Sequence, residues 1–264
     1  MNCLRRILPI TIRIEIKRFL HLFRLLNDRR PFTKRSTVKP EKEHFPYILS
    51  ERISRVEKNV PDHLAYLQKN KRKSLEIACK ALNHLPVLPG EYFSLWRILG
   101  RPSRFKGYTK GFEIQNGKLV RNTAGGLCQI ANALCWNALC AGMTIIERHR
   151  HDLDLFPDDH RDVPFGSGAT VVYNYKDFIF FNPLKVPVLI EAYLDDTSLH
   201  VRFLSPEKAP SHIQIQERNA VIEKKGLITI RKNEIWRIIT DNNQSSEELI
   251  FRNEAQVRYE IQLG

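Results

Sequence analysis

Cys128 is the residue in this chain best placed to do chemistry. It follows Gly125 and Gly126 in the run AGGLCQIANALCW, and the apolar residues after it recur at helical steps of three and four. We therefore expect the thiol in the first turn of a buried helix, where unpaired N–H groups and a partial positive charge favour a thiolate. The two glycines would permit a tight turn and a close approach by a substrate.

Two histidines follow in the run ERHRHDLDLFPDD. These residues suggest cysteine-dependent acyl chemistry, with Cys128 as the nucleophile and His149 or His151 carrying the proton. Backbone N–H groups beside the cysteine, together with the Gln129 amide, would hold the oxyanion. The carboxylate that fixes the imidazole would come from a group of aspartates that includes the catalytic candidate Asp162: Asp152, Asp154, Asp158, Asp159 and Asp162.

The candidates for substrate binding are an arginine and several aromatic residues. Arg148 could bind a substrate carboxylate, as could Arg121, although a surface salt bridge is the commoner use of arginine. Aromatic side chains that could line a groove, or equally pack in the core, are Trp96, Tyr108, Tyr173 and Tyr175.

Two further interpretations of the cysteine and histidines stay open. In the first, Cys128 is a small buried residue near a helix cap, and the histidines make structural hydrogen bonds. In the second, zinc is bound by ligands of suitable type: His149, His151, Asp158, Asp159, His160 and the Cys128 thiolate. The spacing matches no standard zinc motif, and we expect no cofactor.

The predicted helix ends near Gly142, which is suited to a C-cap. Residues 122–146 contain no charged side chain, but the amides Gln129, Asn132 and Asn137 and three glycines make a membrane span a poor interpretation. A central helix of a globular core explains the segment better. The turn at residues 166–168 would lie near the site. We reject Ser167 as a nucleophile because the following ATVVYNY predicts a strand rather than the helix of a nucleophile elbow.

The remaining elements are placed by periodicity and turn residues. Residues 46–85 predict helices, the first of them around Ile48, Ile53 and Val56. Asn116-Gly117 predicts a hairpin, and alternating segments between 169 and 205 and after 211 predict strands. The fold expected is α+β, with the helix headed by Cys128 packed on a mainly antiparallel sheet that carries His149 and His151. The N-terminal region would be helical and the C-terminal extension β-rich.

The charge of the chain is concentrated near its start. Residues 1–40 hold eleven basic and two acidic side chains, a net charge of +9 out of +13 for the whole chain. An apolar face formed by Ile16, Phe19, Leu20, Phe23 and Leu26 could hold this arm on an anionic membrane surface, or could pack on the body of the protein. No nucleic-acid reader motif is present, so a nucleic-acid partner is not expected. Composition leaves the oligomeric state open.

Cysteine usage and the N-terminal sequence both bear on location. Five cysteines without paired spacings indicate a reducing compartment. The stretch from Leu4 to Leu26 is interrupted by charges and has no clear cleavage site, so no secretory signal is expected. We expect a cytoplasmic protein, with peripheral attachment to the inner face of the membrane as the alternative.

Three motifs in fixed order give the chain a resemblance to a known family. The run GEYFSLWRILGRPSRFKGY is followed by AGGLCQIANALCW, ERHRHDLDLFPDD and VPFGSGATVVYNY, and together they resemble the VanW family. Many broader family members carry an acidic residue at the position of Gly168. If that acid orients a histidine, this chain needs another partner for it.

The resemblance implies a bacterial accessory protein of cell-envelope or peptidoglycan metabolism with a link to glycopeptide resistance. An amide of a cell-wall peptide is the substrate expected for the thiol chemistry, and a non-catalytic module for cell-wall precursors is the alternative. Four regions are predicted: a basic arm and linker at 1–45, a helical region at 46–90, the VanW-like core at 91–210 and a β-rich end at 211–264.

Overall fold

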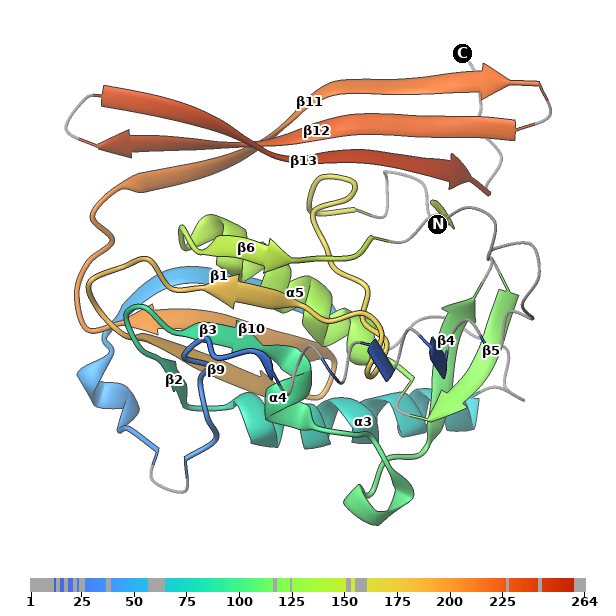
Figure 1. The fold of residues 1–264 in the computed structure, drawn as a ribbon, viewed down its shortest axis with the longest axis horizontal. Coiled ribbons are helices and arrows are strands. Elements are labelled where there is room, and N and C mark those ends of the chain that lie inside the picture. Colours follow the sequence, from blue (N-terminus) through green and yellow to red (C-terminus); the bar gives the residue numbers. More distant parts are fainter. Residues whose placement is uncertain are drawn as a thin grey trace.

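The computed structural model confirms an α+β fold (Figure 1). It describes residues 12, 15, 16, 19, 20, 23, 27–36, 39–56, 65–115, 118–123, 125–150, 153–154, 161–226, 228–241 and 244–258. Antiparallel sheets dominate, and the β-rich C-terminal part forms a layer of its own at the top of Figure 1.

The central sheet has the strand order β1-β10-β9-β2, antiparallel throughout. Its strands are β1 (Tyr47–Arg55), β2 (Leu85–Val87), β9 (Val188–Leu194) and β10 (Ser198–Ser205). Two helices, α3 (Ala65–Leu82) and α5 (Leu127–Cys140), contact each other and pack against this sheet. Alternation along β10 buries Leu199, Val201 and Phe203 in the same core as the helices.

Helix α5 is the central helix that the sequence predicts. Most of its side chains are buried, because the sheet, α3 and the C-terminal layer surround it. Its one fully buried amide, Asn137, donates hydrogen bonds to Ala133 O (2.9 Å) and Val201 O (3.0 Å), which ties the helix to β10. The helix ends as expected, with Gly142 in the left-handed region at φ 75° two residues after Cys140.

Smaller elements surround the start of α5. Strand β3 (Tyr92–Ser94) pairs with β8 (Ile179–Phe181), which pairs with β6 (Thr144–Glu147). Helix α4 (Leu95–Leu99) follows β3 directly and is capped by the Ser94 hydroxyl, which accepts from Arg97 N. After the 3₁₀ turn η3 (Arg104–Lys106), β4 (Lys110–Gln115) and β5 (Lys118–Thr123) form the predicted hairpin.

The C-terminal layer contains the three longest strands of the described chain. They are β11 (His212–Lys225), β12 (Ile228–Asp241) and β13 (Gln244–Val257), and β13 adds the short parallel strand β7 (Leu153–Asp154) at the edge. The alternating segments after residue 211 are thus confirmed as strands. The layer is bonded to the core where Arg237 donates to Met143 O at 2.9 Å, just after α5.

Three local predictions were wrong. The apolar residues at 48, 53 and 56 fit a helical spacing, yet residues 47–55 form β1, because pairing with β10 satisfies backbone groups on both sides of a bulge at residue 49. Residues 169–175 form no strand; an isolated bridge between Val172 and Lys176 closes a turn instead. The strand β6 ends at Glu147, so His149 lies in the irregular segment after it.

The four predicted regions stay predictions, and in the structure some of them are joined by a shared sheet and by hydrogen bonds. Strands β1 and β2 lie in one sheet with β9 and β10, so the predicted helical region at 46–90 and the predicted core share a sheet. The predicted linker also contacts the core, since Thr33 N donates to Tyr92 O at 2.9 Å and Phe32 is buried.

Candidate functional site

A cleft of about 1050 Å³ opens at the start of α5. The described residues that line it come from four segments: Glu15 with Phe19; Trp96 with residues 101–105; Thr123 with residues 125–128; and residues 171–174. Five of the predicted site residues are therefore brought to one place: Trp96, Gly125, Gly126, Cys128 and Tyr173.

Cys128 lies in the first turn of α5, as expected, and is partly exposed in the cleft. Its thiol donates a hydrogen bond to Val171 O, which also lies in a segment that lines the cleft, at a sulfur–oxygen distance of 3.8 Å. Among the other cysteines of the described chain, Cys79 and Cys135 are buried and Cys140 is partly exposed, and burial raises the pKa of all three to about 12. Cys128 is therefore the described cysteine placed for nucleophilic chemistry.

Close packing requires glycine at position 126, before the cysteine, and at position 111 in the neighbouring hairpin. Gly126 is the N-cap of α5 with φ 102°, and a Cβ there would lie 2.6 Å from Lys71 Cγ. Gly125 O lies 2.9 Å from where a Cβ of Gly111 would stand, so the two backbones approach closely. Gly126 and Gly111 thus let the chain turn from β5 into α5 close to α3 and the hairpin.

Trp96 and Tyr173 form an aromatic wall of the cleft. Their rings meet edge to face with centroids 5.5 Å apart. The indole Nε1 of Trp96 donates to Lys176 O at 2.8 Å, which joins α4 to the end of the 172–176 turn. Both aromatics combine core packing with a surface on the cleft, and Tyr108 by contrast is fully buried.

A buried carboxyl group fixes α4 beneath this wall. Asp177 accepts hydrogen bonds from the Ser94 hydroxyl (2.5 Å), Trp96 N (3.2 Å) and Phe178 N (2.7 Å). Burial raises the pKa of Asp177 to about 6 despite these bonds, and the neighbouring Glu147 charge raises it further.

His149 is paired with a carboxylate that the sequence analysis did not consider. Its Nε2 lies 2.9 Å from Glu147 Oε1, the oxygen that also accepts from Asp177 N at 3.0 Å. The His149 carbonyl accepts from Thr170 N (2.7 Å), next to the Val171 that contacts Cys128. The i, i+2 spacing of Glu147 and His149 was the available signal. His149 is not among the described residues that line the cleft, and His151 lies outside the described residues.

Gln129 and Asp162 are bonded to strand β1. The Gln129 amide nitrogen donates to Ser54 Oγ and Arg55 O at 2.9 Å each, and so holds the end of β1 against α5. Asp162 pairs with Arg52 at 2.5 Å, and this hydrogen bond lowers the pKa of the Asp162 carboxyl. The catalytic roles predicted for both residues stay predictions, and these contacts are structural.

Arg148 and Asn132 hold the loop that contains PFGSGATV. Arg148 donates to Gly168 O (2.8 Å), to Gly166 O and to Asn253 Oδ1 (3.1 Å), with its guanidinium over the Phe251 ring. Asn132 Oδ1 accepts from Ala169 N at 2.8 Å. A Cβ at Gly168 would lie 2.3 Å from that same oxygen, which explains glycine at this position. Arg148 is thus a clamp on the loop.

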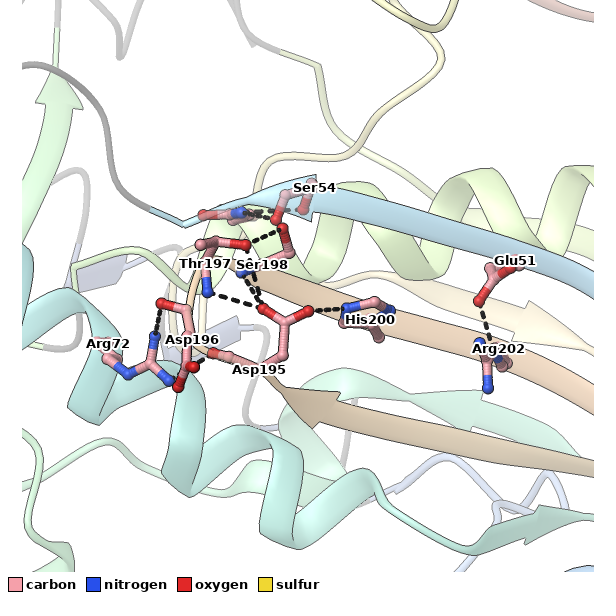
Figure 2. Close-up of polar contacts among 10 residues, drawn as sticks. Glu51, Ser54, Arg72, Asp195, Asp196, Thr197, Ser198, His200 and Arg202 are labelled. Atoms are coloured by element: carbon pink, nitrogen blue, oxygen red, sulfur yellow. Dashed lines mark hydrogen bonds and ion pairs between the residues drawn. The ribbon is translucent and has the colours of Figure 1, made fainter.

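A second polar cluster closes the turn between β9 and β10 (Figure 2). Asp195 Oδ1 accepts from Thr197 N (2.7 Å) and Ser198 N (2.6 Å), while Oδ2 lies 2.6 Å from His200 Nε2. The hydrogen bond with His200 is the main cause of a lowered pKa at Asp195. Aspartate favours turns because its side chain can accept hydrogen bonds from nearby backbone N–H groups, and Asp195 anchors this turn in that way.

Neither a metal centre nor a membrane span is found in the described part of the chain. No group of three histidine, cysteine or acidic side chains among the described residues could hold a metal ion. The predicted zinc ligands His151, Asp158, Asp159 and His160 lie outside those residues, so the zinc alternative is untested. No helix built from described residues has both the length and the apolar character needed to span a bilayer.

Comparison with known proteins adds the family. The model of the family described as "VanW like protein" matches residues 70–204, about half of the chain, from within α3 to within β10. The chain belongs to the VanW family. This VanW region contains the three cleft residues Trp96, Cys128 and Tyr173, whereas the basic arm and the layer of β11, β12 and β13 lie outside the match.

Two curated proteins resemble this VanW-family chain. It is 27% identical over 219 residues to the "Vancomycin B-type resistance protein VanW" of Enterococcus faecalis, covering 82% of this chain and 80% of that protein. It is 29% identical over 192 residues to the "Uncharacterized protein YoaR" of Bacillus subtilis, covering 66% of this chain and 60% of that protein. The chain matches no solved structure.

Proposed function

We propose that this VanW-family chain is an accessory protein of bacterial cell-envelope metabolism that binds a cell-wall peptide in the cleft and attacks an amide of that peptide with Cys128. One observation carries the proposal: Trp96, Cys128 and Tyr173, from three separate segments, converge on the cleft. The name of the Enterococcus faecalis relative, similar over 82% of this chain, supports a connection to vancomycin resistance.

The proposed chemistry is acyl transfer through a thioester. The Cys128 thiolate adds to the amide carbonyl, the C–N bond breaks, and the amine leaves with a proton donated by an imidazolium. Water or a second amine then attacks the thioester, gives up a proton to the same imidazole, and releases Cys128. The start of α5 favours the thiolate, and backbone N–H groups there would stabilise the oxyanion.

The imidazole in this scheme is His149 or His151. Two contacts support His149: Glu147 fixes its ring, and its carbonyl bonds to the Thr170–Val171 segment that touches the Cys128 sulfur. The carboxylate role is then assigned to Glu147 in place of the predicted aspartates.

A non-catalytic binding module is the second candidate. It is favoured by the position of His149, whose ring is bonded to Glu147 and does not belong to the described lining of the cleft. In this scheme Trp96 and Tyr173 bind the peptide, and Cys128 is a small residue that fits the turn.

Mass spectrometry after incubation with muropeptides separates the two candidates. If the catalytic proposal holds, acid-quenched protein should contain an acyl adduct on Cys128 and the muropeptide should be changed. Both results should be absent in Cys128→Ala. Cys140→Ser is the matched control, because burial raises the pKa of Cys140 to about 12 and it lies at the other end of the same helix. Muropeptide binding without adduct or product, equal in wild type and Cys128→Ala, would leave the binding module and reject the catalytic proposal.

A further inference from the structure

We propose that the rim of the cleft docks onto an anionic lipid bilayer through exposed apolar side chains of the N-terminal segment and of Phe105. This surface, here called the docking rim, consists of Ile16, Phe19, Leu20, Phe23, Phe105 and the neighbouring arginines Arg101 and Arg104. The inference is independent of the chemistry proposed for Cys128.

The apolar side chains of the docking rim face water in the isolated protein. The described residues between 12 and 27 are helical, and the spacing of Ile16, Phe19 and Phe23 places them on one face. Phe19 and Phe23 are 68% and 60% exposed. Ile16 and Leu20, at 45% and 48%, are about half exposed, so the body of the protein covers the described part of this face incompletely.

Phe105 supplies the apolar contact from the body of the protein. It lies at the centre of the turn η3 and is fully exposed. Phe105 and Phe19, far apart in sequence, both line the cleft and are both exposed. Exposed aromatic side chains beside one cleft are unfavourable in water and suited to the boundary between headgroups and acyl chains.

Charge identifies the occupant of this surface. Arg101 and Arg104 are exposed on the same rim. The sequence around the helical residues is also basic, since residues 1–40 hold eleven basic and two acidic side chains. An apolar face bordered by arginine and lysine matches the requirements of an anionic membrane surface, where bases attract headgroups and aromatics insert. In this orientation the cleft opens beside the bilayer.

Flotation of the full-length protein with lipid vesicles tests the proposal. Vesicles of phosphatidylcholine alone are compared with vesicles in which about a third of the lipid is phosphatidylglycerol. The test variants are Phe19→Ser/Phe105→Ser and Arg101→Glu/Arg104→Glu. The matched control is Val221→Ser/Ile222→Ser, because these side chains are 45% and 43% exposed on β11, in the upper layer of Figure 1.

We expect wild type to bind the anionic vesicles, and each test variant to partition onto them roughly tenfold less. The Val221→Ser/Ile222→Ser control and Cys128→Ser should bind as wild type does. Raising the salt should weaken binding. The four positions changed in the two test variants are all exposed, so the melting temperature measured by circular dichroism should not change. Wild type that binds neither vesicle, or a Phe19→Ser/Phe105→Ser protein that binds as before, would overturn the proposal. A dimer that this variant abolishes, without vesicle binding, would assign the rim to a second copy instead.

Discussion

The buried carboxyl of Asp177 makes the stability of the protein depend on pH in an unusual direction. An ordinary aspartate titrates near 3.8, and burial raises the pKa of Asp177 to about 6. The folded state therefore holds a proton that the unfolded state releases between these two values. The stabilisation by Asp177 is complete below pH 3.8, falls as the pH rises through 6, and is fully lost above it.

The size of the effect follows from the shift. At about 1.4 kcal/mol per pKa unit, a rise from 3.8 to about 6 corresponds to about 3 kcal/mol. Asp177→Asn removes the titration and keeps the contacts, because the amide oxygen can accept from Trp96 N and Phe178 N while the amide nitrogen donates to Ser94 Oγ. The variant should gain up to about 3 kcal/mol of unfolding free energy relative to wild type between pH 4 and pH 8.

Urea denaturation at several pH values measures this difference directly. Subtracting wild type from Asp177→Asn at each pH cancels the titration of every group that the two proteins share. A difference that stays within about 0.5 kcal/mol from pH 4 to pH 8 would refute the reasoning, because Asp177 would then titrate alike in both states.

Three further variants probe the residues that position the cleft. In Gly126→Ala the alanine would have to adopt φ 102° with its Cβ 2.6 Å from Lys71 Cγ. The free energy of unfolding, measured by urea denaturation, should fall by about 1–3 kcal/mol, and an unchanged value would contradict the packing. Asn132→Ala should lower the free energy of unfolding by about 1–3 kcal/mol because Ala169 N loses its acceptor. Unchanged proteolysis of the 161–170 loop in this variant would show that the hydrogen bond does not hold the loop. Asp162→Asn, which removes the exposed ion pair with Arg52, should lower the free energy of unfolding by less than about 1 kcal/mol. A larger loss would show that this ion pair stabilises the fold more than a surface pair does.

Local sequence signals predicted those elements that depend on neighbours in the chain. Periodicity placed α5 and its end at Gly142, and Asn116-Gly117 placed the hairpin of β4 and β5. Alternation placed β9 to β13, and the glycine pair with Cys128 placed the thiol in a first helical turn. In each case the determining contacts lie within a few residues, so that spacing alone carries the information.

Contacts between distant residues decided the elements that sequence reasoning missed. Strand β1 exists because β10 pairs with it about 150 residues later, and Ser50 donates to Asn137 O of α5 at 3.1 Å. The 172–176 turn is favoured by Trp96, which bonds to Lys176 O. Spacing at 48, 53 and 56 cannot reveal a partner strand, and this is why the helix pattern misled.

The candidate site was likewise predicted in part. Gly125, Gly126, Cys128, Trp96 and Tyr173 line one cleft. The residue types of Arg148 and Gln129 suit a substrate carboxylate and an oxyanion, whereas in the structure Arg148 bonds to loop carbonyls and Gln129 bonds to β1. Polar residues serve backbone groups as readily as ligands, and only the fold shows which of the two is present.

Alkylation of the native protein by iodoacetamide near neutral pH tests the central claim most directly, that the Cys128 thiol is accessible and activated in the cleft. Peptide mapping resolves each cysteine. We expect Cys128 to react faster than a free peptide thiol, and Cys79, Cys135 and Cys140 to stay unmodified because burial raises the pKa of each to about 12. Alkylation of Cys128 no faster than a free peptide thiol would contradict activation of the thiol, and alkylation as slow as that of buried Cys135 would contradict its exposure in the cleft.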